Sequence, residues 1–405
     1  MSPRFTAYQK RLFVFLSVAT FFEGYDFLAL SQVLTEVRAE FDLSPAQGAR
    51  LVGVVNAGTV LAYFLVQKAD RWGRRNVLMV TILGYTLCTL LSGLAPNALS
   101  FMLFQLVARV FLIGEWAIAM VIAAEEFPAE RRGMVIGVIS AAAGLGSVVC
   151  AGLVPLLLKT PWGFRTVYLA GVIPLLLIAY ARRGLRETAR FEARAGAPPP
   201  DLFAIWRTPY RRRVLELGAI WFLCYVCSQN ALMFWREFAL AERGLSNEEV
   251  GKIVALAALV SMPITFAAGR FLDVVGRKIG GTVLLAIMAA GVFLAYTLRG
   301  VAPLTGAFMV AMTGLSTMLT VLNTFTTELF PTEHRAAAFA WSNNLIGRIG
   351  YWLSPFVIGG LLADYGWGAV MRTTVVFPLA AIGLIWLFLP ETRGRELEQT
   401  AEAPR

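Results

Sequence analysis

The stretch Asp70-Arg71-Trp72-Gly73-Arg74-Arg75 recurs 203 residues later as Asp273-Val274-Val275-Gly276-Arg277-Lys278. Each copy places a glycine directly before two basic residues, and each lies between two long apolar stretches. A polar break that repeats at the same place in two halves of a chain indicates internal duplication. The pair predicts two halves of one fold.

Further matches follow at nearly the same offset. Trp162-Gly163 recurs as Trp367-Gly368, and Glu187-Thr188 recurs as Glu391-Thr392, at offsets one or two residues longer. The largest set has five members and the offset of 203: Glu125, Phe127, Pro128, Glu130 and Arg132 recur as Glu328, Phe330, Pro331, Glu333 and Arg335. We therefore predict duplication of a six-helix unit.

The composition of the 405 residues indicates a membrane protein, with 58% hydrophobic and 15% charged residues, against about 45–50% and about 25% in soluble proteins. A spanning helix needs about 20 apolar residues, and lipid offers no partners for free backbone groups. The apolar/polar alternation of a membrane barrel is missing from the sequence. We predict an all-α protein with twelve transmembrane helices, at residues 11–35, 47–67, 76–95, 98–124, 134–158, 164–183, 214–237, 247–268, 279–298, 302–330, 335–362 and 368–389. The expected parts are an N-terminal six-helix bundle (1–183), a central loop (184–213), a C-terminal six-helix bundle (214–389) and a tail (390–405).

The net charge of +10 would suggest nucleic acid binding in a soluble protein. Here the arginines and lysines gather in every second break, which follows the positive-inside rule. We therefore expect a lipid bilayer and no nucleic acid as partner. The central loop and both termini should be cytoplasmic, in a membrane of the bacterial inner (plasma) type.

Enzyme chemistry finds little support. The sequence carries no HExxH, GxSxG or P-loop motif and no metal-ligand cluster. Cys224 and Cys227 form a CxxC inside an apolar stretch, where cysteines usually act as small apolar residues. We expect no enzyme, no metal and no cofactor, with the proton as coupling ion.

The repeated loop resembles the G-x-x-x-D-x-x-G-R-K/R motif of the major facilitator superfamily. Gly269, Asp273, Gly276, Arg277 and Lys278 match it in full, whereas the first copy has Val66 in place of the initial glycine. The segment from Pro390 to Leu397 is similar to the tail signature of sugar porters. The resemblance covers nearly the whole chain and implies transport by alternating access, with the loop motifs as parts of the gate.

Two further motifs resemble two different subfamilies. Glu23-Gly24-Tyr25-Asp26 resembles the D-G-x-D of aromatic-acid:proton symporters, with glutamate in place of the first aspartate. Gly114-Glu115-Trp116 is similar to the G-E-W of sialate and lactate symporters. Both groups carry carboxylates.

Five charged residues are the candidates for charges near the middle of the membrane: Glu23, Asp26, Arg109, Glu115 and Arg348. Each costs at least about 2.5–3.5 kcal/mol at mid-membrane, so function is the default interpretation. Glu23 and Asp26 share one helix face. We assign proton coupling to Glu23, Asp26, Arg109 and Glu115, leaving open which acid carries the proton, and Arg348 to the substrate carboxylate. A structural Asp26–Arg109 ion pair is the alternative.

Polar and aromatic residues in the spans are the further substrate-binding candidates, with interhelical packing as the alternative: Tyr25, Tyr225, Gln229, Asn230, Asn323, Trp341 and Trp352. The gating candidates are Asp70, Gly73, Arg74, Glu130, Asp273, Gly276, Arg277 and Glu333. We expect Asp70 and Asp273 to face helix N-termini, where an anion is favoured, and the arginines to meet Glu130 or Glu333. Anchoring to lipid headgroups is the alternative.

The leading function is proton-coupled symport of a small organic anion, with aromatic carboxylates among the candidates, by a monomer. An exporter of drugs or amphiphilic compounds is the first alternative. A non-transporting membrane receptor on the same fold is the second.

Overall fold

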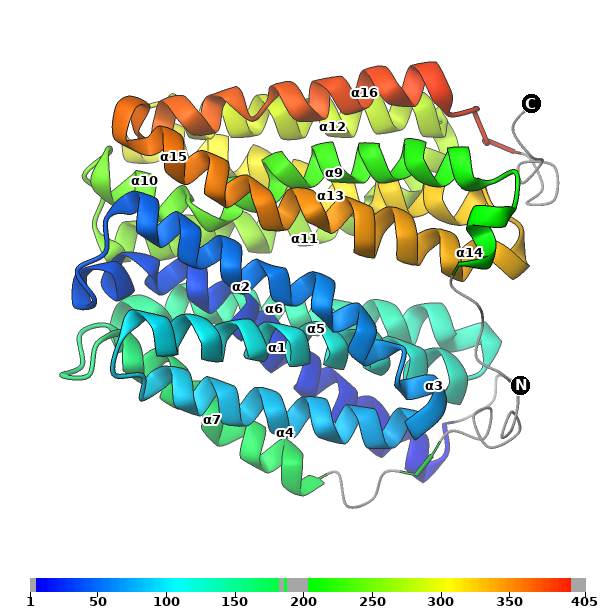
Figure 1. The fold of residues 1–405 in the computed structure, drawn as a ribbon, viewed down its shortest axis with the longest axis horizontal. Coiled ribbons are helices and arrows are strands. Elements are labelled where there is room, and N and C mark those ends of the chain that lie inside the picture. The colour runs from blue at the N-terminus through cyan, green and yellow to red at the C-terminus, as the bar shows by residue number, and fades with distance from the viewer. Residues whose placement is uncertain (1–4, 182–185, 188–202, 395–405) are drawn as a thin grey trace. The chain divides into compact units, whose positions relative to one another are not determined.

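The computed structural model of the chain describes residues 5–181, 186–187 and 203–394. Within these ranges the side chains of residues 70–71, 129–130, 132, 173–181 and 332 lie outside the description. The described part of the chain is helical, without a strand (Figure 1). The all-α fold class predicted from the sequence is therefore confirmed.

The chain divides into two compact units, residues 1–42 with 54–200 and residues 43–53 with 201–405. In chain order, the first six long helices and one short helix are α1 (Ala7–Glu40), α2 (Pro45–Val66), α3 (Ala69–Trp72), α4 (Arg74–Gly93), α5 (Ala98–Glu126), α6 (Ala129–Leu157) and α7 (Phe164–Ala181). The helices that follow are η2 (Ala204–Arg207), α9 (Arg211–Met233), α10 (Trp235–Ala241), α11 (Asn247–Val275), α12 (Arg277–Ala295), α13 (Val301–Glu328), α14 (Thr332–Phe339), η3 (Ala340–Gly347), α15 (Arg348–Thr373) and α16 (Val376–Phe388).

The number of membrane-crossing segments follows from length and composition. Ten helical stretches among the described residues are long and apolar enough to cross a membrane. Residues 333–388 count as one of these ten, although Gly366 interrupts the helix with φ 72° and ψ 172° and so separates two segments. With α7, which has 18 residues, the described chain holds the twelve predicted segments.

Local sequence explains where several helices begin. Thr6 and Gln9 form a capping box at α1, and Ser246 and Glu249 form another at α11. In each box, the side chain of the first residue accepts a hydrogen bond from the backbone N–H of the second, and the side chain of the second accepts one from the backbone N–H of the first. These bonds provide partners at the helix start, where four N–H groups lack helical ones. The first of these boxes places the start of α1 at Ala7, four residues before the predicted start.

Two helices depart from the regular pattern predicted for them. The predicted helix 214–237 ends at Met233 and continues after Phe234 as the short α10. The predicted helix 335–362 contains a π-helical segment, η3, directly before Arg348. A π segment shifts the hydrogen-bond pattern by one residue, which apolar periodicity does not reveal, and such segments are frequent at functional sites.

Close packing by glycine fixes the position of the first acidic motif. A Cβ on Gly24 would lie 1.9 Å from the carbonyl oxygen of Ala143, and one on Gly146 would lie 1.8 Å from that of Phe21. The backbones of α1 and α6 therefore approach to a distance that only glycine permits, as is common where membrane helices pack. This contact holds the turn of α1 that carries Glu23 and Asp26.

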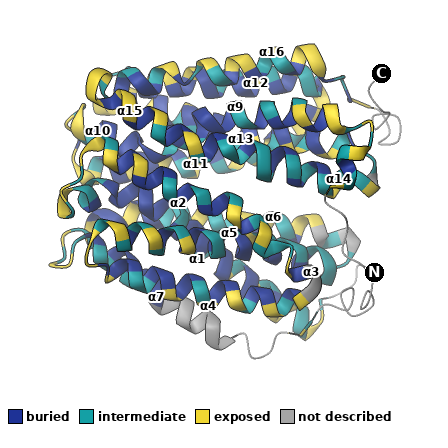
Figure 2. Cartoon of the chain, viewed as in Figure 1, coloured by how far each residue is buried: buried dark blue, intermediate teal, exposed yellow. Residues whose placement is uncertain are grey.

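Large apolar side chains remain exposed along the helices, among them Leu387, Val357 and Phe266. Figure 2 shows exposed residues, in yellow, along the helices. A soluble protein would bury such surface or use it for binding. For a helix in a bilayer, lipid tails are as apolar as leucine, so exposure of these side chains has no cost. The burial pattern accordingly suits a chain embedded in lipid.

Candidate functional site

The four charged residues predicted for proton coupling come together in the first unit. Glu23 and Asp26 lie on α1, whereas Arg109 and Glu115 lie on α5, and all four are at most 8% exposed. Glu23 is within electrostatic reach of Glu115 and Arg109, and Asp26 is within reach of both as well. The sequence-based grouping of these residues is thus seen in space, and we call them the acid cluster.

Asp26 has neighbours on two other helices. Thr89 on α4 donates a long hydrogen bond of 3.4 Å to Asp26 Oδ2. A Cβ on Gly171 would lie 3.3 Å from Asp26 Oδ1, so α7 passes directly beside this carboxyl group. The guanidinium of Arg109 lies 5.0 Å from the ring centroid of Phe27, a cation–π distance. No ion pair of 4 Å or less joins members of the acid cluster in the described structure.

The acid cluster leaves several polar atoms without a hydrogen-bond partner among the described residues: Glu23 Oε2, Asp26 Oδ1, Arg109 Nη1 and both carboxylate oxygens of Glu115. Burying a charge costs much free energy unless the charge is paired. Three carboxyl groups share one guanidinium here, so neutralising the cluster requires that protons be held on carboxyl groups. The arrangement is suited to taking up and releasing protons.

A small cavity adjoins the acid cluster. It has room for about one water molecule. Its lining comes from α1, α4, α5 and α7 of the same unit: Asp26, Tyr85, Thr89, Gln105, Ala108, Arg109, Leu112 and Tyr168. The cavity is too small for an organic substrate, so its ligand must be about the size of a water molecule.

The second unit has a different polar site, which surrounds Arg348. Tyr225 donates a hydrogen bond of 2.8 Å to Asn343 Oδ1 in η3, and the tyrosine also interacts with Arg348. The Tyr225 ring lies 5.2 Å from that of Trp221 and 6.2 Å from that of Tyr351. The predicted pair Tyr225 and Arg348 therefore lies in one aromatic site, and η3 supplies Asn343, which the sequence analysis did not select.

The other predicted substrate contacts are dispersed. Asn230 donates to Ser354 Oγ at 2.6 Å and to the Val226 carbonyl at 2.7 Å, so its amide group serves interhelical packing. Gln229 and Trp352 are half-buried, whereas Asn323 is exposed. Tyr25 is buried in the first unit, where its hydroxyl donates to the Val167 carbonyl at 3.4 Å.

Trp341 is placed differently from Tyr225. Its ring lies 4.9 Å from that of Trp206 and 5.5 Å from that of Phe203. Both partners belong to the segment at η2, before the first long helix of the second unit. The Trp341 ring therefore packs against this segment, and its assignment to the substrate site stays a prediction.

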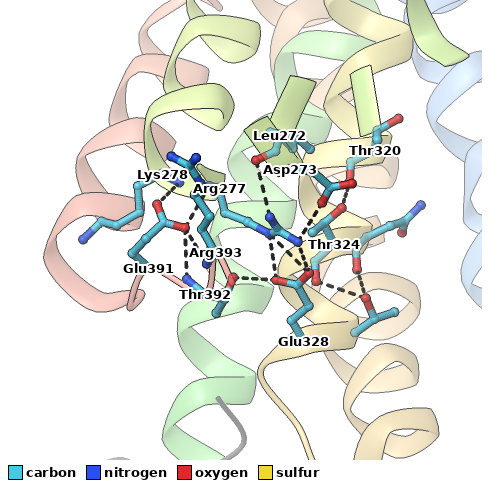
Figure 3. Close-up of polar contacts among 12 residues, drawn as sticks. Leu272, Asp273, Arg277, Lys278, Thr320, Thr324, Glu328, Glu391, Thr392 and Arg393 are labelled. Carbon is cyan, nitrogen blue, oxygen red and sulfur yellow. Dashed lines mark hydrogen bonds and ion pairs between the residues drawn. The ribbon is translucent and has the colours of Figure 1, made fainter. Parts of the chain in front are cut away.

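The repeated loop motif forms a network in the second unit (Figure 3). Arg277 donates to both oxygens of Glu328, with Nη2 to Oε1 at 2.8 Å and Nε to Oε2 at 3.1 Å, and its Nη2 lies 2.9 Å from Asp273 Oδ1. Glu391 accepts hydrogen bonds from the backbone N–H groups of Arg277 and Lys278, both at 2.9 Å. Glu391 thus caps the N-terminus of α12, where a helix favours negative charge.

The first unit repeats the same arrangement. Arg74 Nη2 lies 3.5 Å from Glu125 Oε1. Glu187 accepts hydrogen bonds from the backbone N–H groups of Arg74 at 3.0 Å and Arg75 at 3.3 Å, at the N-terminus of α4. We call Arg74, Glu125 and Glu187 the first-unit network, and Arg277, Glu328 and Glu391 the second-unit network.

The predicted partners in these networks need correction. Glu391 caps the N-terminus of α12, whereas Asp273 pairs with Arg277 and has 66% of its side chain exposed. Glu333 meets His334, at 3.6 Å, rather than the arginine of the motif. Gly73 and Gly276 have φ of 92° and 107°, which requires glycine. The predicted gating residues Asp70 and Glu130 lie outside the described side chains.

Four glutamates of the two networks were not among the predicted gating residues, although they are repeat matches: Glu125, Glu187, Glu328 and Glu391. Their signal was that match, since each glutamate recurs at the same spacing from a motif arginine or at a spacing one residue longer. Tyr85 and Tyr168 were also missed, and tyrosine within an apolar run carries no such signal. Among the described residues, no group of three or more histidine, cysteine or acidic side chains could hold a metal ion.

Comparison with known proteins places these sites in a family. A Bacillus subtilis protein named as a niacin/nicotinamide transporter, NiaP, is 25% identical over 397 residues, with 96% of this chain and 98% of that protein covered. A Cupriavidus pinatubonensis protein named as a 4-methylmuconolactone transporter is 27% identical over 344 residues, with 83% and 79% covered. The crystal structure of a bacterial homologue of the human lysosomal transporter Spinster, inward-facing and unoccupied, matches the fold with a TM-score of 0.79 at 18% identity, over 95% of this chain and 97% of that one.

The family model of the Major Facilitator Superfamily matches residues 16–355, which include the acid cluster, both loop motifs and Arg348. The predicted superfamily, the membrane embedding and the expectation of a transporter rather than an enzyme are therefore confirmed. By sequence and by fold, this chain belongs to the Major Facilitator Superfamily of membrane transporters.

Proposed function

We propose that the protein is a proton-coupled symporter of small organic anions and works by alternating access. The observation that carries the proposal is the acid cluster, in which three buried carboxyl groups accompany one guanidinium group within one six-helix unit. A permanently charged cluster of this composition would be costly in a membrane protein. Binding of protons to the carboxyl groups lowers that cost. Proton binding to the acid cluster can therefore be coupled to transport of the substrate.

Asp26 is the best candidate for the proton carrier. It lies beside Arg109, receives a hydrogen bond from Thr89 and borders the cavity. An approaching cation favours the charged carboxylate, and burial favours the neutral acid. Movement of Arg109 relative to Asp26 during the transport cycle would therefore switch the proton on and off.

Arg348 is the candidate for binding the substrate carboxylate. A guanidinium group binds a carboxylate through two parallel hydrogen bonds. Tyr225 interacts with Arg348, and its ring packs against those of Trp221 and Tyr351. The names of the two relatives given above point the same way, because niacin is an aromatic carboxylic acid and 4-methylmuconolactone is also a small organic acid. Aromatic and unsaturated monocarboxylates are accordingly the substrates to test first.

The test is uptake of labelled nicotinate, benzoate and gallate into proteoliposomes under an imposed inward proton gradient. We expect stimulation by the gradient, loss of that stimulation in Asp26→Asn, and a raised KM in Arg348→Lys because lysine cannot form the bidentate contact. Asp364→Asn, at an exposed position of α15, is the matched control and should behave as the unmodified protein. An uptake rate that is unchanged by the proton gradient would exclude proton coupling. Gradient-driven efflux of amphiphilic compounds would favour an exporter.

A further inference from the structure

Four polar atoms that lack partners converge on one cavity. Asp26 Oδ1, Tyr85 OH, Arg109 Nη1 and Tyr168 OH have no hydrogen-bond partner among the described residues, and all four residues line the cavity beside the acid cluster. Their exposed fractions are 8%, 2%, 3% and 1%. A buried hydrogen-bonding group without a partner costs about 1–3 kcal/mol, so four such groups around one space point to a ligand that satisfies them together.

The size and chemistry of the cavity restrict that ligand. The space accommodates about one water molecule, and a buried water needs two to four polar partners. The carboxylate of Asp26 accepts hydrogen bonds, the guanidinium of Arg109 donates them, and a tyrosine hydroxyl can do either. Water is the small molecule that can donate to Asp26 and accept from Arg109 at once.

We propose that this cavity binds one ordered water molecule, which bridges Asp26 to Arg109 and is held in place by Tyr85 and Tyr168. The inference rests on the proposed function and adds two positioning residues to it. The water gives Asp26 a hydrogen-bond partner that can accept its proton and return it without contact with the substrate. The two tyrosines hold that water where Asp26 can reach it.

The groups that surround Asp26 come from each helix packed against it. The combined electrostatic field of these groups sets the protonation of Asp26. Removing the neutral hydroxyl of Tyr85 or Tyr168 takes a hydrogen-bond partner from the water and leaves the charged groups in place. The surrounding groups are Glu23 and Tyr25 on α1, Tyr85 on α4, Arg109 and Glu115 on α5, Cys150 on α6 and Tyr168 on α7.

The first experiment compares Tyr85→Phe and Tyr168→Phe, singly and combined, with Tyr296→Phe. Tyr296 is equally buried at 1%, and its hydroxyl donates to the Ala231 carbonyl at 2.9 Å, so it controls for loss of a buried hydroxyl outside the site. Two activities are measured in proteoliposomes, namely gradient-driven uptake of nicotinate and nicotinate–nicotinate exchange. We expect the double variant to lose gradient-driven uptake by about tenfold and to retain exchange, which needs no net proton movement.

The second experiment fills the cavity. Ala108→Val adds two methyl groups to its lining and should reproduce the selective loss, whereas Ala119→Val, buried on the same helix outside the lining, should not. Ala108→Val would also show whether the tyrosine variants act through the water or through their own hydroxyls. Replacing chloride by gluconate in the assay tests for a bound anion, and a strict need for chloride would overturn the water assignment.

Asp26→Asn, measured in parallel, separates the two proposals. If the gradient does not stimulate uptake by the unmodified protein, the proposed function fails. If Asp26→Asn keeps gradient-driven uptake, Asp26 is not the proton carrier and the bridging water is refuted with it. If Asp26→Asn loses it while the double tyrosine variant and Ala108→Val equal their controls, proton coupling stands and the bridging water is refuted. Equal loss of uptake and exchange in the tyrosine variants would assign them a purely structural role and also refute the inference.

Discussion

In the first-unit network Arg74 Nη2 lies 3.5 Å from Glu125 Oε1, whereas in the second-unit network Arg277 Nη2 lies 2.8 Å from Glu328 Oε1. The exposed fractions of the side chains are nearly the same, 10% and 15% in the first pair and 12% and 17% in the second. Solvent screening therefore cannot account for the difference between the pairs. The difference lies in geometry, since Arg277 also donates through Nε to the same carboxylate.

The helix caps differ in the same sense. Glu391 accepts from two backbone N–H groups of α12 at 2.9 Å, and Glu187 accepts from the corresponding groups of α4 at 3.0 and 3.3 Å. Thr392 adds a hydroxyl that donates to Glu328 and so ties the cap to the arginine pair (Figure 3). The two copies share the plan of the network, and the distances compared here are shorter in the second copy. We infer that the second copy contributes more to holding this conformation.

The largest expected effect comes from breaking the arginine pair of the second-unit network. Glu328→Gln removes the charge that Arg277 meets through two nitrogens, which should lower stability by about 3 kcal/mol. Glu125→Gln is the matched change in the first-unit network and should cost less, because its pair is longer. Thermal unfolding of both variants in detergent measures this, and equal losses would show that the distances do not reflect bond strength.

Both networks contain a glycine with a positive φ, and replacing it tests this shared feature. Gly276→Ala and Gly73→Ala each place a side chain at a φ near 100° that favours glycine, at a cost of about 2 kcal/mol. A Cβ at position 276 would also lie 3.1 Å from Glu391 Oε2. We therefore expect similar losses from the two variants, with the larger loss at position 276. The same unfolding assay serves here, and the opposite order would contradict the comparison.

The fold could be predicted because its signals are local and repeated. Apolar length predicted the helices, and the repeated motifs predicted the superfamily to which the chain belongs. The partners of Arg74 and Arg277 could not be predicted from the sequence. For Arg277, the choice between Glu328 and Glu333 depends on the residue at which α13 ends. The prediction extended that helix to residue 330, whereas it ends at Glu328, so its last turn presents Glu328 to Arg277.

The acid cluster was predictable for a different reason. A charge inside an apolar span is rare enough to stand out by itself, which identified Glu23, Asp26, Arg109 and Glu115. The cavity beside them depends on how α1, α4, α5 and α7 pack, and Tyr85 and Tyr168 are ordinary residues of apolar runs until that packing is known. The π segment η3 was equally hidden, since it changes hydrogen bonding and leaves the composition unchanged.

The smallest expected effect concerns the helix cap at Glu391, which lies after α16. Burial tends to raise the pKa of this carboxyl group, but four backbone N–H donors, those of Lys278, Arg277, Arg393 and Thr392, outweigh it and hold the pKa below its ordinary value. A lowered pKa in the folded state means that the group stabilises the fold above its ordinary pKa. That contribution should be lost as pH falls through the folded-state value.

Glu391→Gln should therefore cost about 1 kcal/mol near neutral pH and cost progressively less as the pH falls below about 4. Unfolding of the variant and the unmodified protein from pH 3 to pH 7 measures the difference. A constant difference across this range would show that the carboxylate charge at Glu391 does not stabilise α12. Glu187→Gln, changed at the matching position of the first unit, shows whether the looser cap at α4 carries a smaller share, as its longer hydrogen bonds predict.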